Sequence, residues 1–323
     1  FKKGKIDSSA ESILINELRN ERTISELCYA TGLSQLELLG SIEQLRLKGY
    51  DIVQYRINDQ VGYTTNKKVI VTYDEFKHYH DIKKKIKIGL VSDTHIGSMY
   101  WQPTYLKRAY EDFKEQGITD VYHVGDISEG TYSGRPGAVY ETYVYGFDQQ
   151  VSEISKVYPK VDGIKTHFIT GNHDATHIMN GGANIGIALQ DKRSDLNYLG
   201  HEYAKIWLTE NVDMDLIHPR DGTSYALSYQ LQKRINNMSG GNKPKILITG
   251  HYHKNFSMLY RNIWAVSMAS FQAQSPFMRG KGIESDVGYL ILEISVNQHG
   301  DIIEFNPIYK PLYVVIKDDY LNK

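Results

Sequence analysis

Residues able to do chemistry occur at five separated places, and each place holds Asp, Asn or His. They are the pairs Asp93/His95, Asn172/His173 and His251/His253, and the single residues Asp126 and His218. Carboxylate oxygen and imidazole nitrogen together suit divalent manganese, iron or zinc. Alternate side chains of an extended segment point to the same side, so Asp-x-His and His-x-His each direct two donors one way. The sequence therefore predicts a metal centre built from several segments.

Each of these places follows a run of residues typical of a β-strand. The five runs are residues 88–91, 120–124, 165–170, 214–217 and 245–249. Further strands are predicted at 263–267 and 289–295, and helices at 103–116 and 147–158. This pattern predicts an α/β fold. Because ligands of open α/β sheets bind beyond the carboxyl ends of the strands, the five places are expected to converge.

Asp126 is the natural bridge between two cations, since a carboxylate can bind both. Two cations about 3.5–4 Å apart can activate a bridging water and steady the leaving oxygen of a phosphoryl group. Glycines precede Asp126, Asn172 and His251. A glycine permits the sharp turn at positive φ that a strand end needs. The residues thus favour a two-metal phosphoesterase, a hydrolase.

The whole motif series resembles the calcineurin-like metallophosphoesterase superfamily, in the order of that family. The series is Asp93-x-His95, Gly125-Asp126, Gly171-Asn172-His173-Asp174, His218 and Gly250-His251-x-His253, within residues 88 to about 295. The resemblance implies a four-layer α/β/β/α sandwich. It also implies a dinuclear centre in which a metal-bridging water is the nucleophile.

The resemblance further implies a role for each motif residue. Asp93, His95 and His253 would hold one metal ion, and Asn172, His218 and His251 the other, with Asp126 between them. His173 would protonate the leaving group or steady the transition state, and Asp174 or Glu129 would orient it. Manganese is the expected cation, with iron, zinc and magnesium as alternatives.

Short motifs bear on the substrate. Protein Ser/Thr phosphatases of the superfamily have Gly-Asp-x-x-Asp-Arg-Gly as second motif, and Gly130 stands here at the Arg position. Residues 93–98 are similar to the first motif of double-strand-break repair nucleases and of the small subunit of archaeal D-family DNA polymerases. Residues 271–277 resemble a segment of that polymerase subunit. These similarities imply a DNA nuclease, exonuclease-like, with DNA as partner.

Two other functions stay open. One is a phosphatase or phosphodiesterase acting on nucleotides or other small phosphoesters. The other is a DNA- or protein-binding assembly factor with a relict metal site. For substrate phosphates, Arg135, Arg279 and Lys281 are the candidate contacts. The tyrosines of loop 131–146 suit base stacking, and an ordinary ordered loop or a dimer contact is the alternative.

Residues 1–75 differ in pattern from the rest of the chain. Three short helices and a hairpin resemble a winged helix-turn-helix domain, with Thr23 and Ser34 as helix caps. The helix at 35–48 mixes acidic and basic residues, so DNA and protein contact both stay open. In the wing, Arg56, Lys67 and Lys68 are candidate phosphate contacts. Residues 76–87 are predicted to be a charged linker, and 88–323 the phosphoesterase domain.

The overall composition bears on the cellular location and partners of the protein. The formal net charge of −1 gives no general basic field, and Cys28 is the single cysteine. No run approaches the roughly 18 apolar residues of a membrane span, and no signal-peptide core is visible near Phe1. We therefore expect a cytoplasmic protein without a membrane partner. The oligomeric state is left open.

Overall fold

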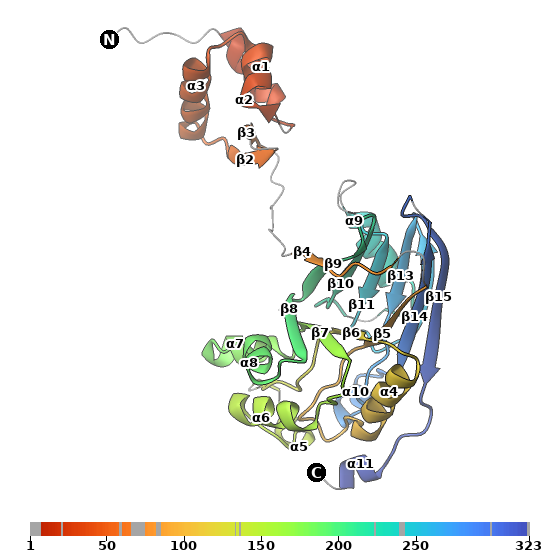
Figure 1. Cartoon of the computed structure of the whole chain (residues 1–323). Helices are drawn as coiled ribbons and strands as arrows, with labels where there is room; N and C mark the ends of the chain where they lie inside the picture. Colours follow the sequence, from red (N-terminus) through yellow and green to blue (C-terminus); the bar gives the residue numbers. More distant parts are fainter. Residues whose placement is uncertain are drawn as a thin grey trace. The chain divides into compact units, whose positions relative to one another are not determined.

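The computed structural model describes residues 8–20, 22–57, 60–65, 75–81, 85–132, 134–135, 137–222, 224–238, 243–297 and 299–321. The chain divides into two compact units, Phe1–Thr72 and Tyr73–Lys323 (Figure 1). Among the described helices, none is long and apolar enough to cross a membrane.

The N-terminal unit has three helices and a small antiparallel sheet. Its elements are α1 (Ser8–Glu17), α2 (Ile24–Thr31), α3 (Gln35–Leu47), β1 (Arg22–Thr23), β2 (Val53–Ile57) and β3 (Gln60–Thr64), with strand order β1-β3-β2. Capping boxes start two helices, Thr23 with Glu26 and Ser34 with Glu37. Each satisfies backbone N–H groups that the first helical turn leaves free.

A separate hydrophobic core holds this unit together. It consists of Leu14, Leu18, Leu27, Leu38, Ile42, Leu45, Ile52 and Tyr63. Its members come from all three helices and from β3, so the unit buries its apolar faces without the rest of the chain. The side chain of Arg56, and Lys67 and Lys68 as a whole, lie outside the described residues.

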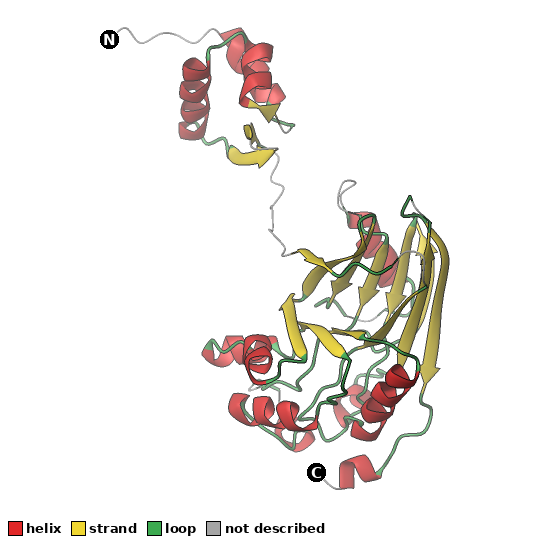
Figure 2. Ribbon diagram, viewed as in Figure 1, coloured by secondary structure: helices red, strands yellow, loops and turns green. Residues whose placement is uncertain are grey.

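Two six-stranded sheets form the centre of the larger unit (Figure 2). One has the order β12-β13-β11-β10-β9-β4, with β4 (Glu75–Lys77), β9 (Tyr203–Thr209), β10 (Val212–Ile217), β11 (Ile246–Thr249), β12 (Phe256–Tyr260) and β13 (Ile263–Ser267). The other has the order β15-β14-β5-β6-β7-β8, with β5 (Ile86–Val91), β6 (Asp120–Val124), β7 (Lys165–Thr170), β8 (Leu196–His201), β14 (Gly288–Val296) and β15 (Ile302–Pro311).

The helices of this unit are α4 (Pro103–Glu115), α5 (Ala138–Glu141), α6 (Phe147–Val157), α7 (Ala175–Gly181), α8 (Ile185–Lys192), α9 (Tyr229–Asn237), α10 (Pro276–Gly280) and α11 (Asp318–Leu321). Most of them gather on one side of the strands, and α9 lies apart from these (Figure 1).

Alternation along the strands divides the side chains among three cores. Leu290 and Leu292 of β14 face the core between the sheets, whereas Ile291 faces the core under the helices. In β11, Ile248 faces the inner core and Leu247 packs with α9. Helices, two sheets and α9 thus make four layers. The predicted α/β/β/α fold is confirmed.

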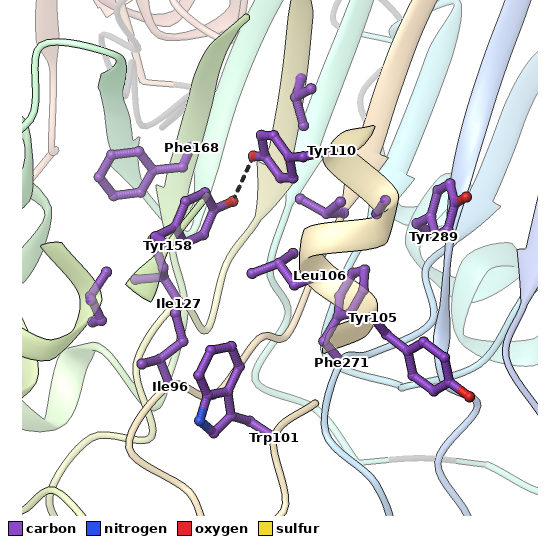
Figure 3. Packing of buried hydrophobic residues seen from close by; sticks show 14 of the residues in the cluster. Ile96, Trp101, Tyr105, Leu106, Tyr110, Ile127, Tyr158, Phe168, Phe271 and Tyr289 are labelled. Carbon is purple, nitrogen blue, oxygen red and sulfur yellow. Dashed lines mark hydrogen bonds between the residues drawn. The ribbon is translucent and has the colours of Figure 1, made fainter. Parts of the chain in front are cut away.

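The core under α4 also anchors the loops that follow β5 and β6. Ile96 and Ile127 are fully buried there, beside Trp101 and Phe271 (Figure 3). Each isoleucine comes directly after a predicted ligand, His95 or Asp126. Hydrophobic burial therefore fixes where these loops leave the sheet.

Part of the predicted linker belongs to a sheet instead. Glu75–Lys77 forms β4 and pairs in parallel with β9, and β5 begins at Ile86. Lys83 and Lys84 lie outside the described residues, while Lys85 forms a 3.0 Å ion pair with Glu304. A three-residue edge strand inside a charged stretch carries too little pattern to be read from the sequence.

We predict that the two units can be destabilised separately. Leu38→Ala removes a fully buried side chain from the N-terminal core, and should cost that unit about 2–5 kcal/mol. Hydrogen–deuterium exchange of the full chain should then show faster exchange in α1–α3 and unchanged exchange in β5–β7. Leu36→Ala is the matched control, because Leu36 lies on the same helix and is 83% exposed. Equal effects in both units would contradict the separation.

Candidate metal centre

The five predicted segments meet where parallel strands end. β5, β6 and β7 are neighbours in one sheet, and β10 and β11 are neighbours in the other. The loops after them carry all seven predicted metal ligands: Asp93, His95, Asp126, Asn172, His218, His251 and His253. The structure brings these side chains together around Asp126.

The donor atoms form two groups, which a third group, His95/Asp126/His173, joins. In each of Asp93/His95/His253 and Asp126/His218/His251, the candidate ligand atoms lie within 4.8 Å of one another. Asp126 Oδ2 lies 3.1 Å from His218 Nε2 and 3.9 Å from His95 Nε2. It thus faces a member of each group, while Asp126 Oδ1 accepts a hydrogen bond from the His173 backbone N–H at 2.8 Å.

The remaining predicted ligands complete both groups. Asn172 Oδ1 lies 3.1 Å from His218 Nε2. His253 Nε2 lies 3.2 Å from Asp93 Oδ1 and 3.3 Å from His95 Nε2. Oxygen and nitrogen atoms packed this closely and turned toward one another suit cations between them.

Five of the seven ligand residues have a left-handed backbone. Their φ angles are 51° at Asp93, 47° at His95, 54° at Asp126, 75° at His251 and 52° at His253. Residues with a Cβ rarely adopt this region, and such conformations gather at functional sites. The strand ends turn sharply at the ligands themselves.

Glycines make room for the imidazole of His218. A Cβ on Gly125, whose φ is +88°, would lie 2.2 Å from His218 Nδ1. A Cβ on Gly171 would lie 2.3 Å from Asp126 Oδ1. The glycines predicted to permit the turns are therefore also needed because side chains of the centre pack closely against them.

In three of the histidine rings, Nδ1 has a hydrogen-bond partner. His218 Nδ1 donates to the Val124 carbonyl at 2.7 Å, and His95 Nδ1 donates to Glu129 Oε2 at 3.1 Å. His253 Nδ1 lies 3.3 Å from Ser285 Oγ. These bonds leave Nε2 of each ring facing the other donors, as second partners of metal-binding histidines do. The donor set and its orientation fit two divalent ions.

Electrostatics around Asp126 favour positive charge. Burial disfavours the charged form of His218, but the Asp126 carboxylate outweighs this effect and raises the pKa of His218 to about 10. Burial lowers the pKa of both His95 and His251 to about 4, so these rings are neutral at pH 7. A cation would take the place of the proton on His218.

Glu129 was predicted as a partner of His173, whereas the support by Gln272 was not apparent from the sequence. The buried Glu129 carboxylate lies 3.1 Å from His95 Nδ1 and 3.8 Å from His173 Nδ1. Gln272 Nε2 donates to Glu129 Oε2 at 3.1 Å and to Ser98 Oγ at 2.8 Å. Both contacts join residues far apart in the chain. The only sequence signal was that Ser98 and Gln272 fall inside the two motifs similar to the polymerase subunit.

His173 and Asp174 have different hydrogen-bond partners. His173 Nδ1 donates to the Glu129 backbone carbonyl at 2.8 Å. The Asp174 carboxylate instead accepts from the backbone N–H groups of Ile127, Ser128 and Gly171. Asp174 therefore ties the loops after β6 and β7 together, and its role in orienting His173 stays a prediction.

A cavity of about 320 Å³ lies over the centre. Its lining includes His95, Asp126, His173, His251, His253, Arg135 and Phe277. The guanidinium of Arg135 lies 4.4 Å from the Phe277 ring centroid and 5.4 Å from that of Tyr132. Arg279 and Lys281 are exposed and do not line this cavity. Of Arg135, Arg279 and Lys281, Arg135 is the one that lines it.

Residues 86–280 match the calcineurin-like phosphoesterase superfamily domain, so the chain belongs to this superfamily. The small subunit of DNA polymerase II from Methanothermobacter thermautotrophicus is 22% identical over 324 residues, which cover 82% of this chain. The chain spans 65% of the length of that curated relative.

Two solved structures are among those that resemble this chain. An archaeal phosphodiesterase is 15% identical with a TM-score of 0.39, covering 70% of this chain and 100% of its own. Zinc-complexed Vps29 from Entamoeba histolytica is 15% identical with a TM-score of 0.34, covering 69% of this chain and 99% of its own.

We predict that Gly125→Ala weakens metal binding. Its Cβ would displace His218, and disturbed support of a ligand typically lowers metal affinity roughly 10–100-fold. Gly163→Ala is the control, since Gly163 has a similar φ of +86° and nothing within 4 Å of its Cβ position. Titration calorimetry with Mn²⁺ should separate the two variants. Equal affinities would show that His218 does not need this space.

Proposed function

We propose that the larger unit is a divalent-metal-dependent phosphodiesterase that hydrolyses DNA, acting at strand ends. The observation that carries the activity is the convergence of six other predicted ligands on Asp126, with His173 in the same cavity. Membership of the phosphoesterase superfamily supports it. The DNA substrate rests on similarity to a DNA polymerase subunit and on the motifs at 93–98 and 271–277.

The ligands divide between two ions. Asp93, His95 and His253 would hold one, Asn172, His218 and His251 would hold the other, and Asp126 would be shared between them. Manganese is our first choice of cation. When bound, two such ions activate water and neutralise charge on a phosphoryl group.

His173 transfers a proton in this proposal. Its Nδ1–H is fixed on the Glu129 carbonyl, so Nε2 is the atom that exchanges a proton with the leaving oxygen. Burial lowers the pKa of His173, while the charges of Asp126 and Glu129 oppose that shift. The ring is therefore neutral at rest and gains its second proton only beside a negative substrate.

Arg135 is the proposed contact for a substrate phosphate. Phe277 and Tyr132 flank its guanidinium, and Nη2 lies 3.5 Å from Glu129 Oε1 and 3.6 Å from Glu141 Oε2. These partners hold a planar cation at the cavity wall before substrate arrives. A fixed guanidinium suits the paired oxygens of a phosphate. Arg279 and Lys281, outside the cavity, would act only on a longer substrate.

A second candidate substrate is a nucleotide or another small phosphoester. The cavity over the ligands is confined, which suits a small molecule. A neighbouring cavity of about 600 Å³ contains His218, Arg220 and Arg234. Both arginines there are paired, with Glu202 and Asp221 respectively. This rim is not strongly basic, so it offers little positive charge to bind the phosphates of an extended duplex.

The N-terminal unit is a proposed winged helix that contacts protein. Arg46 donates to the Ile52 carbonyl at 3.2 Å, and Lys48 forms an ion pair with Glu11, so α3 uses these basic groups internally. Leu36 and Leu47 of α3 are each 83% exposed. An assembly factor with a relict metal site remains the rival function, and the intact donor set counts against it.

Single substitutions should distinguish residues needed for metal binding from residues needed for hydrolysis. With Mn²⁺, the chain should hydrolyse bis-p-nitrophenyl phosphate, and Asp126→Ala should abolish both metal binding and hydrolysis. His173→Ala should keep the metal and lower turnover by roughly 10²–10⁴-fold. His299→Ala, at an exposed position, is the control. If wild-type protein binds no metal, the proposed activity fails and the rival function gains.

A substrate panel tests the substrate class. With Mn²⁺ at low salt we expect hydrolysis of single-stranded and duplex DNA from the ends, faster than that of nucleotides or a phosphopeptide. End-labelled and circular DNA distinguish the modes, because a circle offers no end. Preference for nucleotides would favour the second candidate, and cleavage of the circle would exclude action confined to ends.

A further inference from the structure

A second cluster of potential ligands lies away from the metal centre. The candidate ligand atoms of His78, Asp120 and His167 all lie within 4.8 Å of one another. Asp120 begins β6, whereas Asp126 follows its end. Six residues of extended strand separate them by roughly 20 Å. The cluster therefore lies at the opposite end of the sheet from Asp126.

Strand register explains why these side chains meet. Tyr122 of β6 faces the core between the sheets, and His167 of β7 is its register partner. Asp120, two residues before Tyr122, points to the same side. Across the core, Phe76 of β4 packs inward, and His78 follows it by two residues. One sheet supplies Asp120 and His167, and the other supplies His78.

The contacts within the cluster are close. His167 Nε2 lies 3.0 Å from Asp120 Oδ1, and the ring centroids of His78 and His167 lie 4.2 Å apart. Tyr122 Oη lies 3.1 Å from His78 Nδ1, and the Asn197 side-chain amide lies 3.0 Å from His167 Nδ1. A 180° turn of that amide presents its oxygen to Nδ1–H and leaves Nε2 free to bind.

His80 adds a fourth donor beside the cluster. Its backbone N–H bonds to the Leu208 carbonyl at 2.8 Å, which holds this segment against β9. Its Nε2 is buried and has no hydrogen-bond partner in the part of the chain that the structure describes. His80 also lines a cavity of about 340 Å³, together with Asp81 and Thr209.

We propose that His78, Asp120 and His167 bind a divalent zinc-type cation at a site separate from the phosphoesterase centre. Two imidazoles and one carboxylate are a donor set for zinc, and a water would complete four-coordination. The ion joins β4 of one sheet to β6 and β7 of the other. Its role is structural, because β4 has three residues and is an edge strand.

The site can be located directly. Crystals of the full chain grown with zinc should show an anomalous scattering peak at the zinc edge between His78 and His167. Zinc content after dialysis should fall by one ion per chain in His167→Gln and in Asp120→Asn, and stay unchanged in His299→Gln. Hydrolysis of bis-p-nitrophenyl phosphate by all three variants should remain within about twofold of wild type.

A stability measurement guards against variants that merely fold badly. In the Asp126→Ala background, which disables the phosphoesterase centre, zinc should still raise the melting temperature. His167→Gln added to that background should abolish the zinc effect while leaving the melting temperature without zinc nearly unchanged. An absent anomalous peak, or zinc content equal to wild type in both cluster variants, would overturn the proposal.

Discussion

The left-handed backbone at the metal centre is the constraint on which the rest of the larger unit depends. Conformations of this kind cost on the order of 1–3 kcal/mol each, and five ligand residues adopt them. They persist because neighbouring contacts leave no alternative. Ile96 and Ile127 are locked in the core, and the Asp174 carboxylate clamps three backbone N–H groups of the adjoining loops. Core packing and hydrogen bonds of the larger unit thus hold these strained turns in place.

Burial of charge is the second condition, and it follows from the first. Sharp turns place the carboxylates of Asp93 and Asp126 in a site that is nearly closed to water. An unpaired carboxylate there would be strongly unfavourable. Without a metal, the neighbouring imidazoles compensate, which is why the pKa of His218 rises while that of Asp126 falls. The centre therefore favours the binding of cations. The hydrogen-bond partners of the histidine rings keep ring nitrogens turned toward it.

The features of the fold and site that could be predicted from the sequence are those set by residues close together in the chain. The strands ending at Val91, Val124 and Thr170 are rich in apolar and β-branched residues, so the predicted strands match the structure closely. The predicted ligands follow these strands at once, and the structure brings them together. β15 contains prolines and polar residues because it is an edge strand, and no pattern marked it. The support by Gln272 joins positions 143 residues apart, which no local spacing reveals.

Substrate choice depends on what surrounds the centre more than on the centre itself. The same donors serve any phosphoester, so selection must come from the cavity walls. Arg135, held between Phe277 and Tyr132, offers one fixed cation in a confined space. A strand end needs only its terminal residue inside such a cavity, whereas internal cleavage needs a groove open on both sides. The confined cavity therefore agrees better with a terminal phosphodiester or a nucleotide than with the middle of a duplex.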